Sequence, residues 1–98
     1  MNIAKTEILQ KLSSVKPLLY KKYNVTELAL FGSYSRDEQN EKSDIDIMVD
    51  FENITYRNLC NTAYTLYDIF PSIKVQIVSK NAIKPAYFNA IKNDLVYA

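Results

Sequence analysis

The chain contains no histidine, one glycine and one cysteine among its 98 residues. Without histidine it cannot build a Ser-His-Asp or Cys-His catalytic site or a histidine-ligated zinc site. Any chemistry must therefore come from carboxylates, hydroxyls, amines or another metal. The single cysteine, Cys60, has no partner within the chain for a disulfide. This fits a reducing compartment, with Cys60 serving as a small apolar residue in the protein interior.

A strong charge of either sign and a long apolar run are also absent. Lysine and arginine number 12 against 11 aspartate and glutamate residues, so the net charge is +1. Such an even balance supplies no basic field for nucleic acid, and we expect no direct nucleic-acid binding. No apolar stretch approaches the ~20 residues of a membrane span, and the N-terminus has no apolar signal-peptide region. We therefore expect a cytoplasmic protein with no membrane partner.

The length predicts a single domain over residues 1–98, because typical domains have about 100–150 residues. A chain of this size buries roughly two-thirds of its unfolded surface. That is enough for one core, but not for a second lobe that would bind another substrate.

Apolar periodicity predicts an α/β fold, a small sheet of three or more strands with helices packed on it. The expected elements are helices over residues 2–22, from 53 or 55 to 70, and from 84 onward, and strands over 27–31, 44–51 and 73–78. Pro17 falls inside the first helix, where it removes a hydrogen bond, so we expect a kink or a restart there. Tyr56, Tyr64 and Tyr67 lie on neighbouring faces of the middle helix. They either cover the edge of the core or form a surface for a partner.

The only glycine, Gly32, stands at the end of the first strand-like run and is followed by Ser33. A glycine in this place marks a sharp turn or a close approach of the backbone to a ligand. Free backbone N–H groups and a hydroxyl at such a turn are suited to phosphate oxygens. Gly32 and Ser33 are therefore candidate nucleotide-binding residues.

Ten residues after Ser33, Asp44 and Asp46 open the second strand-like run. Residues i and i+2 of a strand project from the same face, roughly 6.6 Å apart, so the two carboxylates point the same way. Such a pair stays ionised only if it is exposed or if a cation lies between its members. Hard oxygen ligands next to a phosphate site suit Mg²⁺, which makes Asp44 and Asp46 the candidate catalytic and metal-binding residues.

The spacing of Gly32-Ser33, ten residues and Asp44-x-Asp46 resembles the signature of the DNA polymerase beta-like nucleotidyltransferase superfamily. The sequences L-F-G-S-Y-S-R and S-D-I-D-I-M-V are similar to those of its minimal, MNT-type members, which are often paired with HEPN-domain toxins. The resemblance implies a mixed sheet with the active site at the Gly-Ser turn. It also implies an antitoxin enzyme that binds ATP or another nucleoside triphosphate with Mg²⁺ and, with ATP, transfers AMP to a hydroxyl of a HEPN-type partner, most often that of a tyrosine.

Arg36 occupies a position where the family has arginine, so the resemblance implies contact with the nucleotide. The alternative is a surface ion pair with Glu38 or Asp37. The family usually has glycine where this chain has Asp37, which predicts a stiffer and more acidic loop.

The chain departs from the family pattern at the third carboxylate, a position that the resemblance assigns to Gln76. An amide ligates a hard cation weakly and cannot accept a proton at neutral pH. The alternative function is therefore an antitoxin that neutralises its partner by binding alone, with a weakened catalytic site. A third possibility is a plain α/β domain in which the two motifs coincide by chance.

Overall fold

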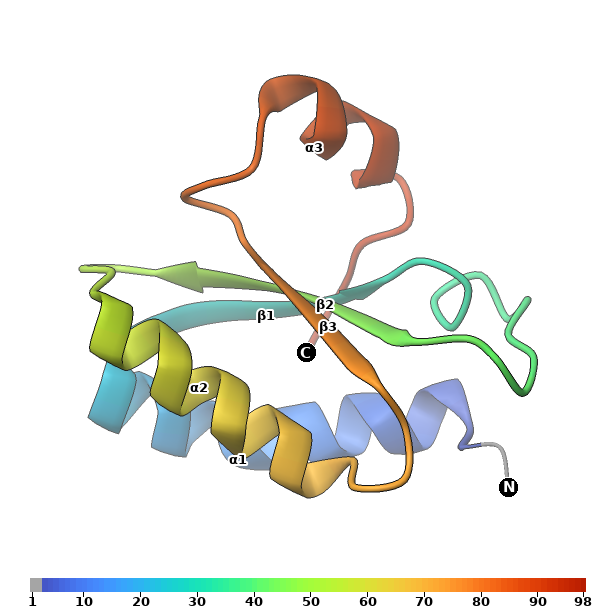
Figure 1. Cartoon of the computed structure of the whole chain (residues 1–98), viewed down its shortest axis with the longest axis horizontal. Helices are drawn as coiled ribbons and strands as arrows, with labels where there is room; N and C mark the ends of the chain where they lie inside the picture. Colours follow the sequence, from blue (N-terminus) through green and yellow to red (C-terminus); the bar gives the residue numbers. More distant parts are fainter. Residues whose placement is uncertain (1–2) are drawn as a thin grey trace.

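The computed structural model describes residues 3–98, which form a four-stranded sheet and three helices (Figure 1). The elements in chain order are α1 (Lys5–Tyr23), β1 (Val25–Phe31), β2 (Ile45–Phe51), α2 (Tyr56–Ile69), β3 (Val75–Ser79), α3 (Pro85–Ile91) and β4 (Val96–Tyr97). This architecture confirms the predicted α/β class.

The strand order in the sheet is β3-β2-β1-β4. The central strand β1 is antiparallel to both β2 and β4, whereas β2 and β3 are parallel, so the sheet is mixed. The parallel pair requires a crossover, and α2 provides it between β2 and β3.

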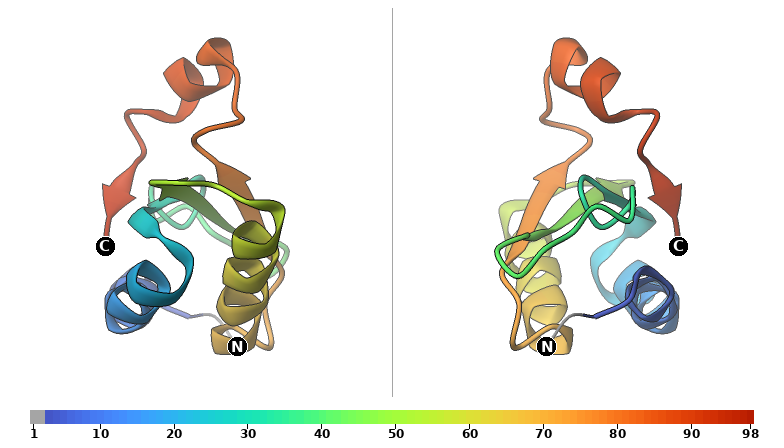
Figure 2. Two further views of the ribbon diagram at one scale, coloured as in Figure 1. Left: turned by 90° about the vertical axis from the view of Figure 1, so that its left-hand side faces the viewer. Right: turned by 90° about the vertical axis from the view of Figure 1, so that its right-hand side faces the viewer.

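One face of the sheet is covered by α1 and α2, which lie side by side beneath it (Figure 2). Alternate residues of the central strands point into this layer and are fully buried: Leu28, Leu30, Ile45, Ile47 and Val49. Ile8, Leu12 and Leu19 of α1 meet them with the four- and seven-residue spacing of a helical stripe. This layer is the main hydrophobic core.

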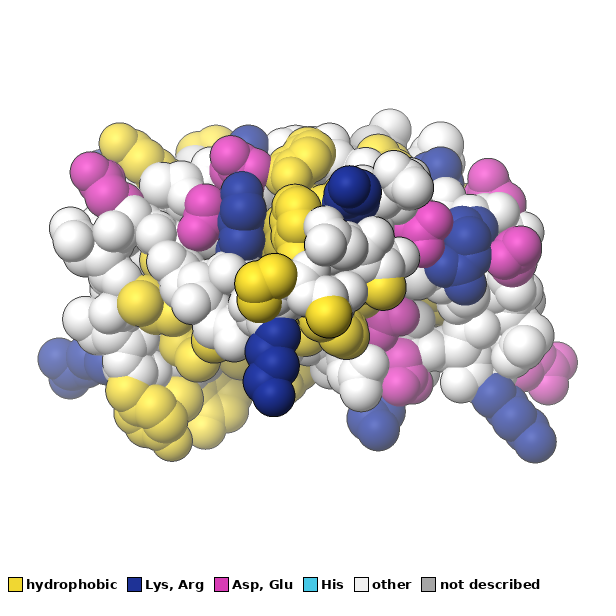
Figure 3. Space-filling view, turned by 90° about the horizontal axis from the view of Figure 1, so that it is seen from above, with side chains coloured by type: hydrophobic (Ala, Val, Ile, Leu, Met, Phe, Trp, Pro, Cys, Tyr) yellow, Lys and Arg dark blue, Asp and Glu magenta, His cyan; other side chains and the backbone are white. Residues whose placement is uncertain are grey.

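The opposite face is covered only in part, by the short helix α3 (Figure 1). Ala29, Phe31 and Met48 form a second, smaller apolar cluster there with Ile91 of α3. The rings of Phe31 and Tyr87 of α3 form a T-shaped pair, with centroids 6.4 Å apart. Seen from the α3 side, the surface mixes acidic, basic and apolar side chains and carries no field of one sign (Figure 3).

Most helix and strand bounds agree with the sequence prediction, with two differences. The first helix is continuous through Pro17, so the expected restart does not occur. The two-residue strand β4 was not predicted at all.

Thr55 caps α2, its hydroxyl accepting a hydrogen bond from the Asn58 amide at 3.0 Å.

Two further observations bear on expectations from the sequence. Tyr56, Tyr64 and Tyr67 are 84%, 65% and 45% exposed, so they lie on the outer face of α2 and do not close the core. No helix within residues 3–98 is long and apolar enough to cross a membrane.

Candidate active site at the uncovered end of the sheet

The turn after β1 begins with a glycine that no other residue could replace without strain. Gly32 has a φ of +79°, in the left-handed region that side chains disfavour. A Cβ atom at this position would also overlap the carboxylate of Asp46. The amides of Arg36 and Glu38 donate to the carbonyls of Gly32 and Ser33 at 3.2 and 2.9 Å, which closes the turn. The backbone of the turn therefore touches the acidic strand directly.

Asp46 lies between the two neighbouring strands, at the end of the sheet that α3 leaves uncovered. It is paired with Phe31 of β1 on one side and with Gln76 of β3 on the other. Ile45 and Ile47 point into the main core, so strand alternation directs Asp46 to the opposite face. Asp44, the residue before β2, lies close enough for its charge to act on Asp46. The predicted pair of carboxylates is thus adjacent to the Gly-Ser turn.

Partial burial raises the pKa of the Asp46 carboxyl above its ordinary value, and the negative charge of Asp44 raises it further. The positive charge of Arg36 acts in the opposite direction. A cation bound beside Asp46 would stabilise the ionised form of this carboxyl.

The donor set fits a metal that arrives with its own phosphate ligands. Within residues 3–98, no group of three acidic, histidine or cysteine side chains could hold a metal ion. The position beside Asp46 on β3 is held by Gln76. Two carboxylates suit Mg²⁺ when substrate oxygens and water supply the remaining ligands.

Arg36 forms ion pairs with two carboxylates in the structure. Its Nε lies 2.8 Å from Oε1 of Glu38, and its Nη1 lies 2.6 Å from Oδ2 of Asp94. The surface ion pair with Glu38 was one of the two open alternatives, whereas Asp37 takes no part. Hydrogen bonds to Glu38 and Asp94 raise the pKa of the guanidinium. Because Asp94 is 58 residues away in the chain, local sequence reasoning could not find it.

The Gly-Ser turn is held in place from two other segments. The Ser35 hydroxyl donates a hydrogen bond to the backbone carbonyl of Asp94, in the segment between α3 and β4. The Lys5 ammonium, at the start of α1, donates to the Ser35 carbonyl at 2.9 Å. Tyr34 is 2% exposed and anchors the turn in the main core. The turn is therefore fixed before any ligand binds.

Asp37 closes this turn with a φ of 57°, which is the backbone conformation that glycine adopts most readily. Aspartate is among the few residues with a side chain that tolerate it. The structure thus explains how aspartate can stand where the family has glycine.

A polar pocket of about 520 Å³ opens next to Asp44. It lies between the loop before β2 and the loop before β3. The residues that line it are Tyr34, Glu41, Lys42, Ser43, Asp44, Ser72, Ile73 and Lys74. Sequence reasoning assigned no chemistry to residues 38–42, because nothing in the sequence indicates that two distant loops meet here.

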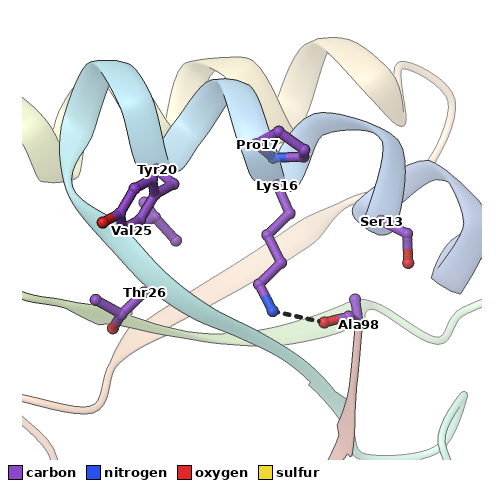
Figure 4. Close-up of a pocket in the computed structure, with 7 residues that line it drawn as sticks. All are labelled: Ser13, Lys16, Pro17, Tyr20, Val25, Thr26 and Ala98. Atoms are coloured by element: carbon purple, nitrogen blue, oxygen red, sulfur yellow. Dashed lines mark hydrogen bonds between the residues drawn. The ribbon is translucent and has the colours of Figure 1, made fainter.

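A second pocket, of about 300 Å³, lies at the opposite edge of the sheet between α1 and β1 (Figure 4). It is lined mainly by apolar groups, including Pro17, Tyr20 and Val25. The Lys16 ammonium donates to the carbonyl of Ala98 at 2.9 Å across its end. The pocket contains no carboxylate side chain and is separate from the acidic pair.

Comparisons with known proteins agree with this arrangement. Residues 13–98 match the family model described as polymerase beta, nucleotidyltransferase. A protein of Methanocaldococcus jannaschii, provisionally named a protein adenylyltransferase, is 45% identical over 94 residues. The match covers 94% of this chain and 95% of that protein. The protein adenylyltransferase MntA of Thermococcus cleftensis is 32% identical over 91 residues, or 93% of this chain and 92% of the relative.

Solved structures share the fold. A chain described provisionally as a minimal nucleotidyltransferase superposes with a TM-score of 0.80 at 22% identity and covers 97% of this chain and 96% of its own length. A chain from the complex of a tri-AMPylated Shewanella oneidensis HEPN toxin with its MNT antitoxin gives a TM-score of 0.67 at 18% identity. That match covers 95% of this chain and 70% of the solved one. At these identities the likeness concerns the fold alone.

Proposed function

The chain belongs to the polymerase beta nucleotidyltransferase family, and on that premise we propose that it transfers AMP from MgATP to a hydroxyl of a partner protein. The acceptor hydroxyl is a tyrosine of a HEPN-type toxin, which the modification silences, so the protein acts as an antitoxin. One observation carries the proposal: the Asp46 carboxylate lies against the glycine turn, with Asp44 close enough for its charge to raise the pKa of Asp46.

Each part of the site has a distinct role in this proposal. Gly32 and Ser33 hold the β- and γ-phosphates with backbone amides and a hydroxyl. Asp44 and Asp46 hold Mg²⁺, which neutralises charge on the phosphates and carboxylates when it is bound. Arg36 lies close enough to influence the ionisation of Asp46 and adds positive charge at the phosphate side of the site.

The transfer is an in-line displacement at the α-phosphorus. The acceptor oxygen forms a bond to that phosphorus and loses its proton to solvent. The bond between the α-phosphorus and the bridging oxygen breaks, and pyrophosphate leaves with the electron pair. The work of the protein is therefore positioning and electrostatic stabilisation more than covalent chemistry.

Two relatives support the choice of acceptor. The Thermococcus relative is named a protein adenylyltransferase, and the Shewanella complex contains a HEPN toxin that carries AMP groups. Residues 3–98 form one sheet with its helices and include no further lobe for binding an acceptor. An acceptor delivered on a partner protein fits this small architecture.

Gln76 favours a second candidate, an antitoxin that neutralises its partner by binding alone. Gln76 stands beside Asp46 in the parallel strand pairing, where active family members have a carboxylate, so no third acid assists the acceptor hydroxyl. Loss of a general base costs about 10²–10⁴ in rate. Nucleotide binding depends on the other groups and would be retained better than turnover.

A labelling experiment separates the two candidates. The protein is incubated with α-labelled ATP, Mg²⁺ and a HEPN-type partner protein, and label on that protein is measured. Transfer by the wild type that is lost in Asp46→Asn supports the adenylyltransferase. Transfer that appears only after Gln76→Asp supports the antitoxin that acts by binding. Transfer unaffected by Asp44→Asn and Asp46→Asn would refute the assigned site.

A further inference from the structure

The side of the acidic pair facing β3 carries a lysine in register with the site. Parallel pairing places Gln76 next to Asp46, and the amide of Ile45 donates to the carbonyl of Lys74 at 2.9 Å. Val75, which lies between Lys74 and Gln76 in the chain, is buried in the main core. Strand alternation therefore directs Gln76 to the face that carries Asp46, and Lys74, the residue before β3, lines the polar pocket together with Asp44.

The two sides of the pair cannot have the same task if the proposed transfer occurs. The Gly32-Ser33 turn follows β1, on one side of β2, and would hold the leaving pyrophosphate. Attacking and leaving oxygens lie roughly in line in a phosphoryl transfer. The acceptor must then approach from the other side of β2, where β3 begins.

That side holds the polar pocket of about 520 Å³ next to Asp44. Two ammonium groups line it, from Lys42 and Lys74, together with the hydroxyls of Ser43 and Ser72. The carboxylates of Glu41 and Asp44 lie on the same lining. Neither lysine forms an ion pair within residues 3–98, so both ammonium groups are available to a ligand.

We propose that this pocket receives the acceptor tyrosine and that the Lys74 ammonium stabilises its phenolate in place of the absent third carboxylate. The inference depends on the proposed function, because it names the acceptor side of the same site. Gln76 cannot take up the phenolic proton at neutral pH, whereas a cation within a few ångströms makes the phenol more acidic. The proton passes to solvent, and the resulting phenolate attacks the α-phosphorus as described above.

The test uses N-acetyl-3-nitrotyrosine amide, a small phenol whose absorption changes when it ionises. Its apparent pKa is measured with saturating wild-type protein, with Lys74→Met and with Lys74→Arg. We expect the wild type to lower this pKa by about one unit, the arginine variant to retain most of the shift, and the methionine variant to lose it. An equal pKa in the presence of the wild type and of Lys74→Met, or no effect of either, would overturn the inference.

Lys80→Met is the matched control, because Lys80 follows the other end of the same strand. Its ammonium lies 5.9 Å from the ring centroid of Phe88, away from the pocket. We expect this variant to shift the probe as the wild type does. An equal loss in both methionine variants would assign the effect to general charge and reject the specific role of Lys74.

Calorimetry with MgATP keeps this inference separate from the proposed function. Unchanged MgATP affinity in Lys74→Met is expected, because the lysine lies on the acceptor side. A tenfold loss of affinity would place Lys74 in the nucleotide site and overturn the inference. Absence of MgATP binding by the wild type would refute the proposed function, and the inference with it, whatever the probe titrations give.

Discussion

The two faces of the sheet are made by the same strands but serve different ends. The side chains that β1 and β2 contribute to the main core, against α1 and α2, are apolar and fully or nearly fully buried. The face toward α3 is apolar around Met48 and acidic at Asp46, two positions earlier on the same strand. Successive side chains of β2 thus point to opposite faces, so the same strand supplies apolar residues to the core and a carboxylate to the candidate site.

The difference teaches why so small a domain can maintain an electrostatically unfavourable site. Each large apolar side chain on the covered face contributes about 1.5–3 kcal/mol by burial. The acidic end of the other face opposes folding, because burial and mutual repulsion hinder ionisation of Asp46. The full layer beneath the sheet offsets this cost.

Removal of one charge from the acidic end should give the largest functional effect. We expect Asp46→Asn to lower AMP transfer about 10³-fold, because an amide binds a hard cation weakly and several kcal/mol of transition-state stabilisation are lost. Label transfer to the HEPN-type partner measures the effect. Asp50→Asn is the matched control, on the same strand but at its far end, and should transfer at the wild-type rate. An equal loss of AMP transfer in both variants would contradict the assignment of the activity to the Asp46 end of this face.

Truncation on the covered face should instead reduce stability. Leu30 is fully buried between the sheet and the helices, and we expect Leu30→Ala to lower the free energy of unfolding by about 2–5 kcal/mol. Urea denaturation followed by circular dichroism measures the change. The affinity of the folded fraction for MgATP should stay unchanged. A variant that is as stable as the wild type but binds MgATP weakly would contradict the assignment of stability to this face and of the site to the other.

The turn that joins the two regions should tolerate glycine but not a branched residue at Asp37. Its φ of 57° costs a β-branched side chain about 1–2 kcal/mol, so we expect Asp37→Val to destabilise the protein by that amount. Asp37→Gly should change stability by less than about 0.5 kcal/mol. Thermal melts of the two variants decide whether the conformation is as constrained as the geometry indicates.

The smallest expected effect is a pH dependence that arises at Asp46. The folded state raises the pKa of this carboxyl above 3.8. At pH values around and between the unfolded and folded pKa, the native protein therefore binds more protons than the unfolded chain. The contribution of this group to stability is therefore full below 3.8 and declines as pH rises through the folded pKa. In denaturation at pH 3 to 7, we expect Asp46→Asn to remove this decline. A group-specific loss of stability on acidification would contradict the sign.

The sequence was sufficient for the layer beneath the sheet and for the acidic strand. The spacing of Leu12 and Leu19 predicts their helix, and strand alternation predicts that Asp44 and Asp46 point the same way. The strand β4 was missed because two residues carry no periodicity. The contact between Arg36 and Asp94 was missed for a different reason: it joins segments 58 residues apart, and only the folded chain brings them together.

That distant contact also bears on how the protein can be handled. Asp94 receives both Arg36 and the Ser35 hydroxyl, and the segment after it adds its edge strand to β1. A shortened version ending at residue 93 would therefore lose the contacts that hold the Gly-Ser turn, along with a few terminal residues. Reporter groups for spectroscopy or immobilisation belong on the outer face of α2, where attachment leaves these contacts intact.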